Sequence, residues 1–371
     1  MDSRVLRHSM KGVAGLMVWI TIAFVAPRAD AACGAVQCFV VIGSQQQVSQ
    51  QGLLAVNLFY NYTPMRLLDD TNGVIPAINQ RERRLILDHH QEAKTITQNV
   101  TLDLNYGVTD RFGIEVMVPY FSRRHSHLDE LGEANGGAGE NVDFGDNGLG
   151  DIRLIAKYNV LSTLRGTLVP GFGVELPTGK SRSLDAANGV MEAPTQLGRG
   201  QAGLIGSLYQ TYQVIPQRVS QFALASYRHT FRNNDGYQFG DEYLLNAGVN
   251  VVTVPWLTLT GQINYRYTTH DNISASLERS LSPADPGFPD DPIVLDSTIL
   301  SRRVPNTGHT YLAFTPGFQI SAGAATSFYF YSSIPMARDS NNNLAQGVSY
   351  VFGLTQYVDT SKLFGSKTAA N

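Results

Sequence analysis

The sequence is poor in the features that mark zinc-binding and nucleic-acid-binding proteins. It has only two cysteines in 371 residues, Cys33 and Cys38, and no second Cys or His pair stands at the spacing of zinc ligands. Basic residues do not outnumber acidic ones, since 28 Lys and Arg stand against 31 Asp and Glu. Binding to DNA or RNA would show as a gathered basic surplus. We therefore predict neither a metal site nor a nucleic-acid partner.

Long hydrophobic runs are almost absent, and the one that occurs lies near the start of the chain. Basic residues precede it and small residues follow it, in the order Arg4, Arg7 and Lys11, then Gly12–Ala26, then Ala29 and Ala31. The run is too short to cross a bilayer as a helix, which takes about 20 residues. This order predicts a secretory signal peptide over residues 1–31. Its removal leaves 24 basic and 29 acidic residues, a net charge of −5.

Both cysteines closely follow the predicted cleavage site. They belong to residues 32–50, which we expect to form a periplasmic N-terminal segment. Cys33 and Cys38 bracket four residues, and an oxidising compartment favours a disulfide between cysteines so placed. A lipid-modified Cys33 is the alternative. Lipoprotein signals usually carry an aliphatic residue where Asp30 stands, so we predict the disulfide.

No second apolar run could form a membrane helix, yet 43% of the residues are apolar and 10% are aromatic. Residues 94–106 show how the chain distributes them. Even positions hold Ile96, Val100, Leu102 and Leu104, whereas odd positions hold Thr, Asn and Asp. Because side chains alternate across a strand, one face is apolar and the other polar. The length matches the roughly 9–11 residues of a membrane-crossing strand.

The same alternation recurs along most of the chain. It is clear in residues 112–120, 151–160 and 257–267, and weaker in residues 52–62, 167–176, 201–212, 220–231, 242–252, 310–320, 326–334 and 347–358. The total is about twelve strands, an even number, as in bacterial outer-membrane barrels. The predicted fold class is all-β: a transmembrane antiparallel β-barrel over residues 51–358, followed by a C-terminal periplasmic tail over residues 359–371.

The lengths of the connections separate a barrel from a soluble β-sandwich. Short connections are expected at Gly107–Arg111, Leu161–Gly166, Gln213–Arg218, Thr253–Pro255 and Ser321–Ala325, and long ones at residues 63–93, 121–150, 177–200, 268–309 and 336–346. They alternate along the chain, apart from a rather short connection at residues 232–241. Short turns at one rim and long extracellular loops at the other are typical of outer-membrane barrels. We therefore expect both termini in the periplasm and the protein in the cell outer membrane.

Aromatic residues and the last strand support the same fold. Tyrosine, phenylalanine and tryptophan residues lie at or near strand ends, where they would form girdles beside the lipid headgroups: Tyr60, Tyr62, Tyr106, Phe112, Tyr120, Tyr158, Tyr212, Tyr243, Trp256, Tyr265 and Tyr267. The segment Gly347–Phe352 resembles the closing-strand signal that the outer-membrane insertion machinery reads. It departs from that signal because the chain continues to Asn371. We expect this machinery and the outer-membrane lipid as partners.

Several short motifs are shared with one family of outer-membrane proteins. They are Tyr106–Phe112 (YGVTDRF), Pro119-Tyr120, Gly148–Ile152 (GLGDI), Lys157-Tyr158 and Leu176–Lys180 (LPTGK). In these motifs the sequence resembles the transporter family labelled MetA-pathway of phenol degradation. The motifs cover the middle third of the chain best and are signatures of turns and strands. The resemblance implies an outer-membrane transporter-like barrel that acts on a small-molecule solute, without naming the substrate.

Charged residues fall on the polar side of the predicted strands. The lumen-facing candidates are Asp103, Glu115, Asp151, Arg153, Lys157, Glu175, Glu242 and Arg266. Two interpretations stay open: a paired network that fills a narrow barrel, and the lining of a selective conduit. Charges of both signs argue against a strongly ion-selective pore.

Catalytic and cofactor motifs do not emerge from the sequence. Gly179-Lys180-Ser181 lacks the glycine that a phosphate loop needs five positions earlier, where Val174 stands. His229 and His309, near strand ends, form no recognisable set of nucleophile, base and orienting group. We predict no enzyme and no cofactor. Two functions remain: passive transport of small molecules, including aromatic or hydrophobic ones, and a closed barrel that acts as a surface receptor or structural anchor.

Overall fold

The computed structural model describes residues 46–75, 77–79, 81, 83–86, 91–129, 138–184, 190–280, 282–283 and 302–360. The predicted signal peptide, Cys33, Cys38 and residues 361–371 of the predicted tail lie outside the described residues. Within these ranges, no helix has the length and apolar character needed to cross a membrane.

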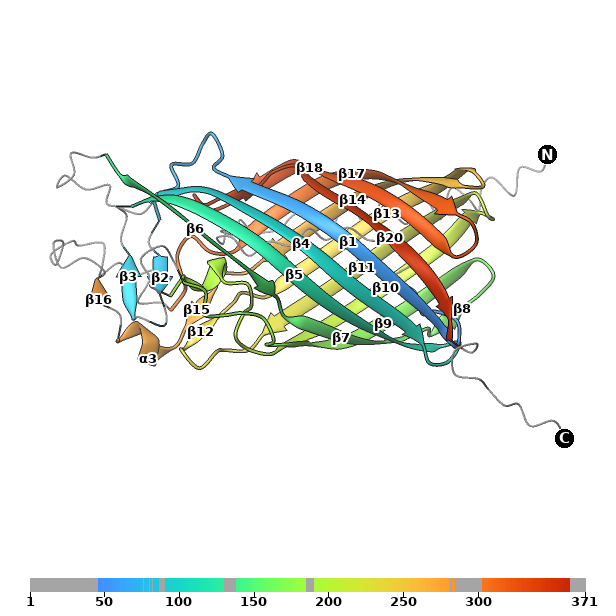
Figure 1. The fold of residues 1–371 in the computed structure, drawn as a ribbon, viewed down its shortest axis with the longest axis horizontal. Coiled ribbons are helices and arrows are strands. Elements are labelled where there is room, and N and C mark those ends of the chain that lie inside the picture. Colours follow the sequence, from blue (N-terminus) through green and yellow to red (C-terminus); the bar gives the residue numbers. More distant parts are fainter. Residues whose placement is uncertain are drawn as a thin grey trace, which may run out of the picture.

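Twelve antiparallel strands form a closed barrel, which confirms the predicted fold class (Figure 1). They are β1 (Leu53–Arg66), β4 (Gln91–Gly107), β5 (Phe112–Asp129), β7 (Ile152–Tyr158), β9 (Gly166–Leu176), β10 (Gly203–Ile215), β11 (Val219–Thr230), β13 (Glu242–Val254), β14 (Leu257–Thr268), β17 (His309–Ala322), β18 (Thr326–Asp339) and β20 (Ser349–Asp359). The first and last strands close the wall, with a register that runs from Leu53 opposite Asp359 to Tyr62 opposite Tyr350. No edge of the barrel is left unpaired in lipid, where each free backbone group would be costly.

The period-two pattern sorts side chains between lipid and lumen. On β4, Val100 faces outward and is 41% exposed, whereas Asp103 faces inward and is 1% exposed. The other strands repeat this arrangement and give the wall a belt of exposed large apolar side chains that includes Leu58, Leu154, Leu245 and Ile263. An apolar belt of this extent on a closed barrel is a lipid-facing surface.

Exposed aromatic rings lie near both rims of the wall. Tyr106, Tyr158, Tyr212 and Trp256 are exposed near the short turns. At the opposite rim, the rings of Tyr227, Tyr243 and Tyr267 line up on neighbouring strands, with centroids 5.1 and 5.9 Å apart. These positions fit girdles at the two headgroup regions.

The prediction of a long loop over residues 121–150 is wrong. Strand β5 continues to Asp129, and β6 (Glu140–Leu149) returns along it, from Asp129 opposite Glu140 to Tyr120 opposite Leu149. The register shifts by one residue before β7, where the Gly150 amide donates to the Pro119 carbonyl at 2.9 Å. This hairpin projects past the wall (Figure 1). Outside the lipid its outer face needs no apolar side chains, so the sequence lacks the alternation that marks the membrane strands.

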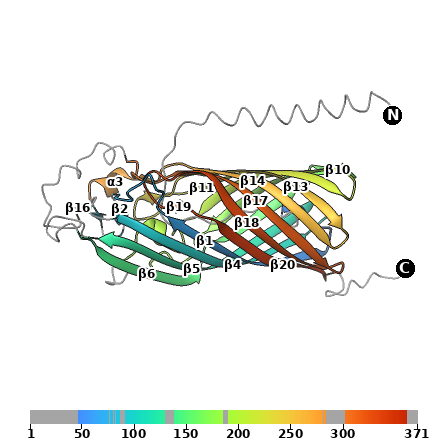
Figure 2. The same ribbon diagram turned by 90° about the horizontal axis from the view of Figure 1, so that it is seen from above.

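The long loops gather beyond one end of the barrel and contain short elements (Figure 2). These are β2 (Ala77–Asn79), β3 (Arg84–Ile86), η2 (Ala193–Thr195), β12 (Tyr237–Gln238), β15 (Asn272–Ile273), α3 (Ala275–Glu278), β16 (Ser282–Pro283) and β19 (Ala345–Gln346), whereas β8 (Leu161–Ser162) lies in a short turn. A cluster of buried apolar side chains holds several of them together: Ile78, Ala193, Tyr237, Phe239, Ile273, Leu277 and Val304.

Asp271 joins several loops of this extracellular cap. Its carboxylate accepts from the Tyr237 hydroxyl at 2.5 Å and from the Gly240 amide at 2.7 Å. Burial raises the pKa of Asp271, and these two hydrogen bonds partly oppose that effect. The cap therefore has its own apolar and polar core rather than consisting of independent loops.

Candidate functional site in the barrel lumen

The eight charged residues predicted to face the lumen are all buried inside the structure. None is more than 7% exposed. Asp103 lies on β4, Glu115 on β5, Arg153 and Lys157 on β7, Glu175 on β9, Glu242 on β13 and Arg266 on β14, while Asp151 lies between β6 and β7. The structure brings them together as two groups at different heights in the lumen.

The upper group is an ion-pair network near the extracellular end. Glu175 Oε2 lies 2.7 Å from Arg153 Nε and 3.1 Å from Arg228 Nη1. Arg228 Nη2 lies 3.1 Å from Glu242 Oε1. Arg266 extends the network more loosely, with Nε 3.8 Å from Glu242 Oε2. Such charge-assisted contacts fix the side chains that line this part of the lumen.

Asp151 ties an extracellular loop to the same network. Its carboxylate accepts from the backbone amides of Gly179 and Arg199 at 2.9 and 2.7 Å. The Arg199 side chain then reaches inward, with Nε 3.8 Å from Glu175 Oε1.

The lower group lies deeper in the lumen and contains Lys157, Glu115 and Asp103. Lys157 Nζ is 2.5 Å from Glu115 Oε2, and both side chains are almost fully buried. Asp103 is close enough to interact electrostatically with both. Two carboxyl groups therefore lie near one ammonium group, and Glu115 forms the ion pair with it.

Sequence reasoning missed three arginines of the upper lumen: Arg123, Arg199 and Arg228. Arg228 lies on the same face of β11 as Phe222 and Leu224, which also face inward, so the inward face of that strand is not clearly polar. Arg123 lies on the strand extension that was predicted to be a loop, and Arg199 lies in a true loop. The position of Arg228 on the same face as other inward residues was the one signal that could have identified it.

Part of the lumen wall is apolar. Val169, Tyr209, Phe222 and Leu224 form one buried cluster on β9, β10 and β11. Tyr329, Tyr331 and Val351 form another on β18 and β20, packed against Phe59. The lumen thus presents both charged groups and aromatic or aliphatic surfaces.

Residues 46–50, just before β1, contact the inner wall near the short-turn end. The Asn105 side chain donates to the Gln47 carbonyl at 2.9 Å, and the Ser49 hydroxyl donates to the Asn105 carbonyl at 3.2 Å. Val48 packs against the Val169–Tyr209–Phe222–Leu224 cluster. On β5, a Cβ added to Gly113 would lie 3.3 Å from Val48 Cγ1. The segment therefore contacts the inner wall along β4 and β5 and along β9 to β11.

A loop folds into the lumen from the extracellular side. Met191, Ala193, Thr195, Gln196 and Leu197 are buried there. Within the loop, the Gln196 side chain accepts a hydrogen bond from the Ser183 amide at 2.8 Å. Residues 191–199 are thus an inward-folded part of the cap.

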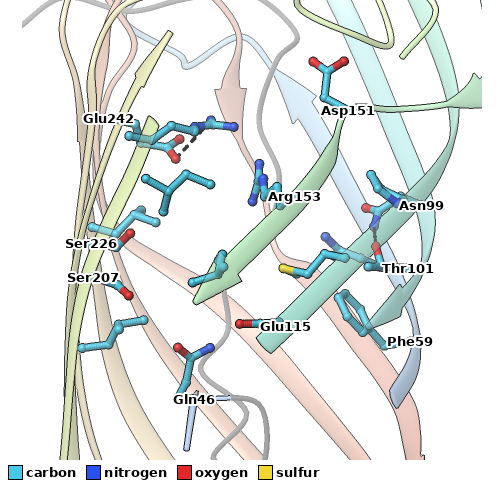
Figure 3. A pocket seen from close by; sticks show the side chains of 18 of the residues that line it. Gln46, Phe59, Asn99, Thr101, Glu115, Asp151, Arg153, Ser207, Ser226 and Glu242 are labelled. Carbon is cyan, nitrogen blue, oxygen red and sulfur yellow. Dashed lines mark hydrogen bonds and ion pairs between the residues drawn. The ribbon is translucent and has the colours of Figure 1, made fainter. Parts of the chain in front are cut away.

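A cavity of about 110 Å³ lies in the lumen, next to Gln46. Figure 3 shows Glu242, Ser226 and Ser207 on one wall, Phe59, Asn99 and Thr101 on the other, and Gln46 at one end. Arg153 and Glu115 point into the space between the walls (Figure 3). The cavity is polar at its charged groups and apolar at Phe59, Leu224 and Val351.

The two histidines considered for catalysis lie apart from this cavity. His229 Nδ1 is 2.7 Å from Asp241 Oδ1 on the outer side of the wall, and His309 Nε2 is 3.4 Å from Thr268 Oγ1. In the described ranges, neither histidine has a serine or cysteine as a hydrogen-bond partner. Among the same residues, no group of three or more His, Cys, Asp and Glu could hold a metal ion.

Comparison with known proteins shows similarity in fold. No family model and no curated protein matches the sequence. An outer membrane channel from Pseudomonas putida F1 matches with a TM-score of 0.56 and 12% identity, over 86% of this chain and all (100%) of that chain. The toluene transporter TbuX from Ralstonia pickettii gives a TM-score of 0.40 and 11% identity, over 82% and 88%, which is too low to carry an argument. The chain has the fold of an outer-membrane β-barrel, and its apolar belt identifies the surface that lies in that membrane.

Proposed function

We propose that the barrel mediates passive passage of small molecules, including aromatic or hydrophobic ones, through its lumen. One observation carries this proposal: residues 46–50 and 191–199 fold into opposite ends of the lumen and are not strands of the wall. Displacing either segment would leave the barrel pairing intact. A barrel of about twelve strands has room for a solute path once its interior segments move.

The lining supports the class of solute. Aromatic and aliphatic side chains such as Phe59, Leu224 and Tyr331 offer contact area to a small apolar body, while nearby polar groups can orient it. The resemblance to the phenol-degradation transporter family points in the same direction.

A closed barrel that acts as a receptor or anchor is the second candidate. The cavity of about 110 Å³ is well below the roughly 300–1,000 Å³ of pockets that hold drug-sized ligands. The ion-pair network also holds charged side chains of five strands together in the upper lumen. A permanently closed interior would serve stability rather than flux.

Planar-bilayer conductance and liposome swelling with arabinose test the proposal on the mature protein. Val48→Asp places a charge against an apolar cluster and should release the segment, raising both conductance and swelling rate several-fold. Val108→Asp is the matched control, because Val108 is exposed at the β4–β5 turn at the same end. If wild type and Val48→Asp both fold but neither gives bilayer conductance or liposome swelling, the closed-barrel function replaces transport.

A further inference from the structure

Among the described residues, a guanidinium buried at the extracellular end of the lumen has only neutral hydrogen-bond partners. Arg123 Nε donates to Thr97 Oγ1 at 3.2 Å. Its Nη1 donates to the carbonyls of Pro194 and Gln196 at 3.1 and 2.6 Å. Within the described part of the chain, no carboxylate pairs with this side chain, although it is only 4% exposed. Buried charges are normally compensated by an opposite charge, so this arrangement favours an added anion.

Two further guanidiniums face the same region with part of their bonding capacity unused. Arg228 Nε is buried and has no hydrogen-bond partner among the described residues. Arg199 approaches Glu175 only to 3.8 Å. Burial lowers the pKa of Arg199 to about 10, and the charge of Arg228 acts in the same direction. Arg199 therefore stays protonated at neutral pH.

These side chains line a cavity of about 40 Å³, here called the arginine pocket. It is lined by Arg123, Arg153, Arg199, Arg228, Phe121 and Phe239, among others. Asp151, Arg153 and Arg228 also line the central cavity, so the two spaces adjoin. The pocket is large enough for two or three water molecules or for one carboxylate group, but too small for an aromatic ring as well.

Aromatic rings stand beside the cationic groups. Arg199 Cζ lies 4.9 Å from the centroid of Phe239, and Arg123 Cζ lies 5.9 Å from that of Phe121. Such stacking holds guanidinium planes in place while leaving their edges to form hydrogen bonds. The edges match the two oxygens of a carboxylate.

We propose that the arginine pocket binds the carboxylate of a small aromatic monoacid, with the ring directed into the central cavity. This deepens the proposed function by naming a class of solute, and it rests on that function for its role in transport. Glu175 and Asp151 also line the pocket and would repel a second negative charge. The site therefore selects a monocarboxylate over a neutral aromatic and over a dicarboxylate.

Isothermal titration calorimetry of the full mature protein in detergent, at constant ionic strength, tests this with three probes. Benzoate should bind saturably. Benzyl alcohol lacks the charge and phthalate carries a second one, so each should bind at least about tenfold more weakly, which corresponds to loss of one charge-assisted hydrogen bond. Equal binding of benzoate and benzyl alcohol by the wild type, or no binding of benzoate, would overturn the proposal.

Variants locate the site. Arg123→Gln and Arg199→Gln should each weaken benzoate binding at least about tenfold, whereas Arg218→Gln, at the exposed β10–β11 turn, should not. Heat-modifiable migration on gels verifies that each variant is folded. Wild-type affinity in a folded Arg123→Gln or Arg199→Gln protein contradicts the proposal. If neither variant folds, the comparison of the three probes on the wild type decides.

The binding measurement tests the pocket, and the flux measurement tests the transport function, so either proposal can be overturned without the other. Saturable benzoate binding without conductance or swelling would leave the pocket standing and remove the transport function. Flux without benzoate binding would support the transport function and remove the pocket.

Discussion

Lys157 and Glu115 form the closest ion pair of the lower lumen, with Nζ and Oε2 2.5 Å apart and both side chains buried. Asp103 provides a second carboxylate for the same ammonium group. The group is therefore asymmetric: one cation lies near two carboxyl groups. Removing the cation and removing one anion should have different consequences.

Lys157→Met should destabilise the barrel far more than Glu115→Gln. The first change leaves two buried carboxylates facing each other and should cost about 3–5 kcal/mol, as expected when one partner of a buried pair is removed. The second leaves Lys157 beside Asp103, so the folded yield should stay close to wild type while conductance changes. Guanidinium unfolding in detergent, with bilayer conductance alongside, measures both. Equal loss of stability in the two variants would mean that Asp103 does not compensate Lys157.

Arg228→Gln should be more damaging than Arg266→Gln. Arg228 bridges Glu175 and Glu242 with two contacts of 3.1 Å, whereas Arg266 approaches Glu242 only to 3.8 Å. Glu175 keeps Arg153 in the first variant, whereas within the described ranges Glu242 keeps only its 3.8 Å contact with Arg266. We expect a loss of about 3–5 kcal/mol for Arg228→Gln, a smaller loss for Arg266→Gln, and altered conductance in the latter. The order of the thermal midpoints checks this, and the reverse order would contradict it.

Val100→Arg should impair assembly, because Val100 faces lipid near the middle of β4. A charge at such a position costs roughly 2–4 kcal/mol. Val108→Arg, at the exposed turn after the same strand, is the matched control and should assemble normally. The fraction of heat-modifiable protein in outer-membrane preparations reports assembly. Normal assembly of Val100→Arg would show that the register of β4 is incorrect.

The disulfide between Cys33 and Cys38 stays a prediction, since both residues lie outside the described residues. Alkylation of the unfolded mature protein without reductant should label neither cysteine, and prior reduction should expose both. Mass spectrometry of the N-terminal peptide distinguishes the outcomes. Full labelling without reductant would show that the pair is open.

The strands were predictable because lipid on one side and a polar lumen on the other impose opposite demands on neighbouring residues. Segments such as residues 94–106 carry that contrast in most pairs of neighbouring positions. The hairpin of β5 and β6 leaves the lipid, so the contrast fades and its residues resemble a loop.

The site was only partly predictable. Arg153 and Glu175 were identified because they alternate with apolar residues on their strands. Arg123, Arg199 and the segment at Val48 were not, since their positions depend on loops and a strand extension folding back into the lumen. Contacts between such distant segments leave no period in the sequence.

The pairing of β1 with β20 joins strands from opposite ends of the chain, from Leu53 opposite Asp359 onward. Closure consequently waits for translation and export of nearly the whole polypeptide. A product truncated before Ser349 would hold two open strand edges, and neither could be satisfied in hydrocarbon. Without β20 the wall therefore cannot close, so pairing of the last strand depends on export of all the strands before it.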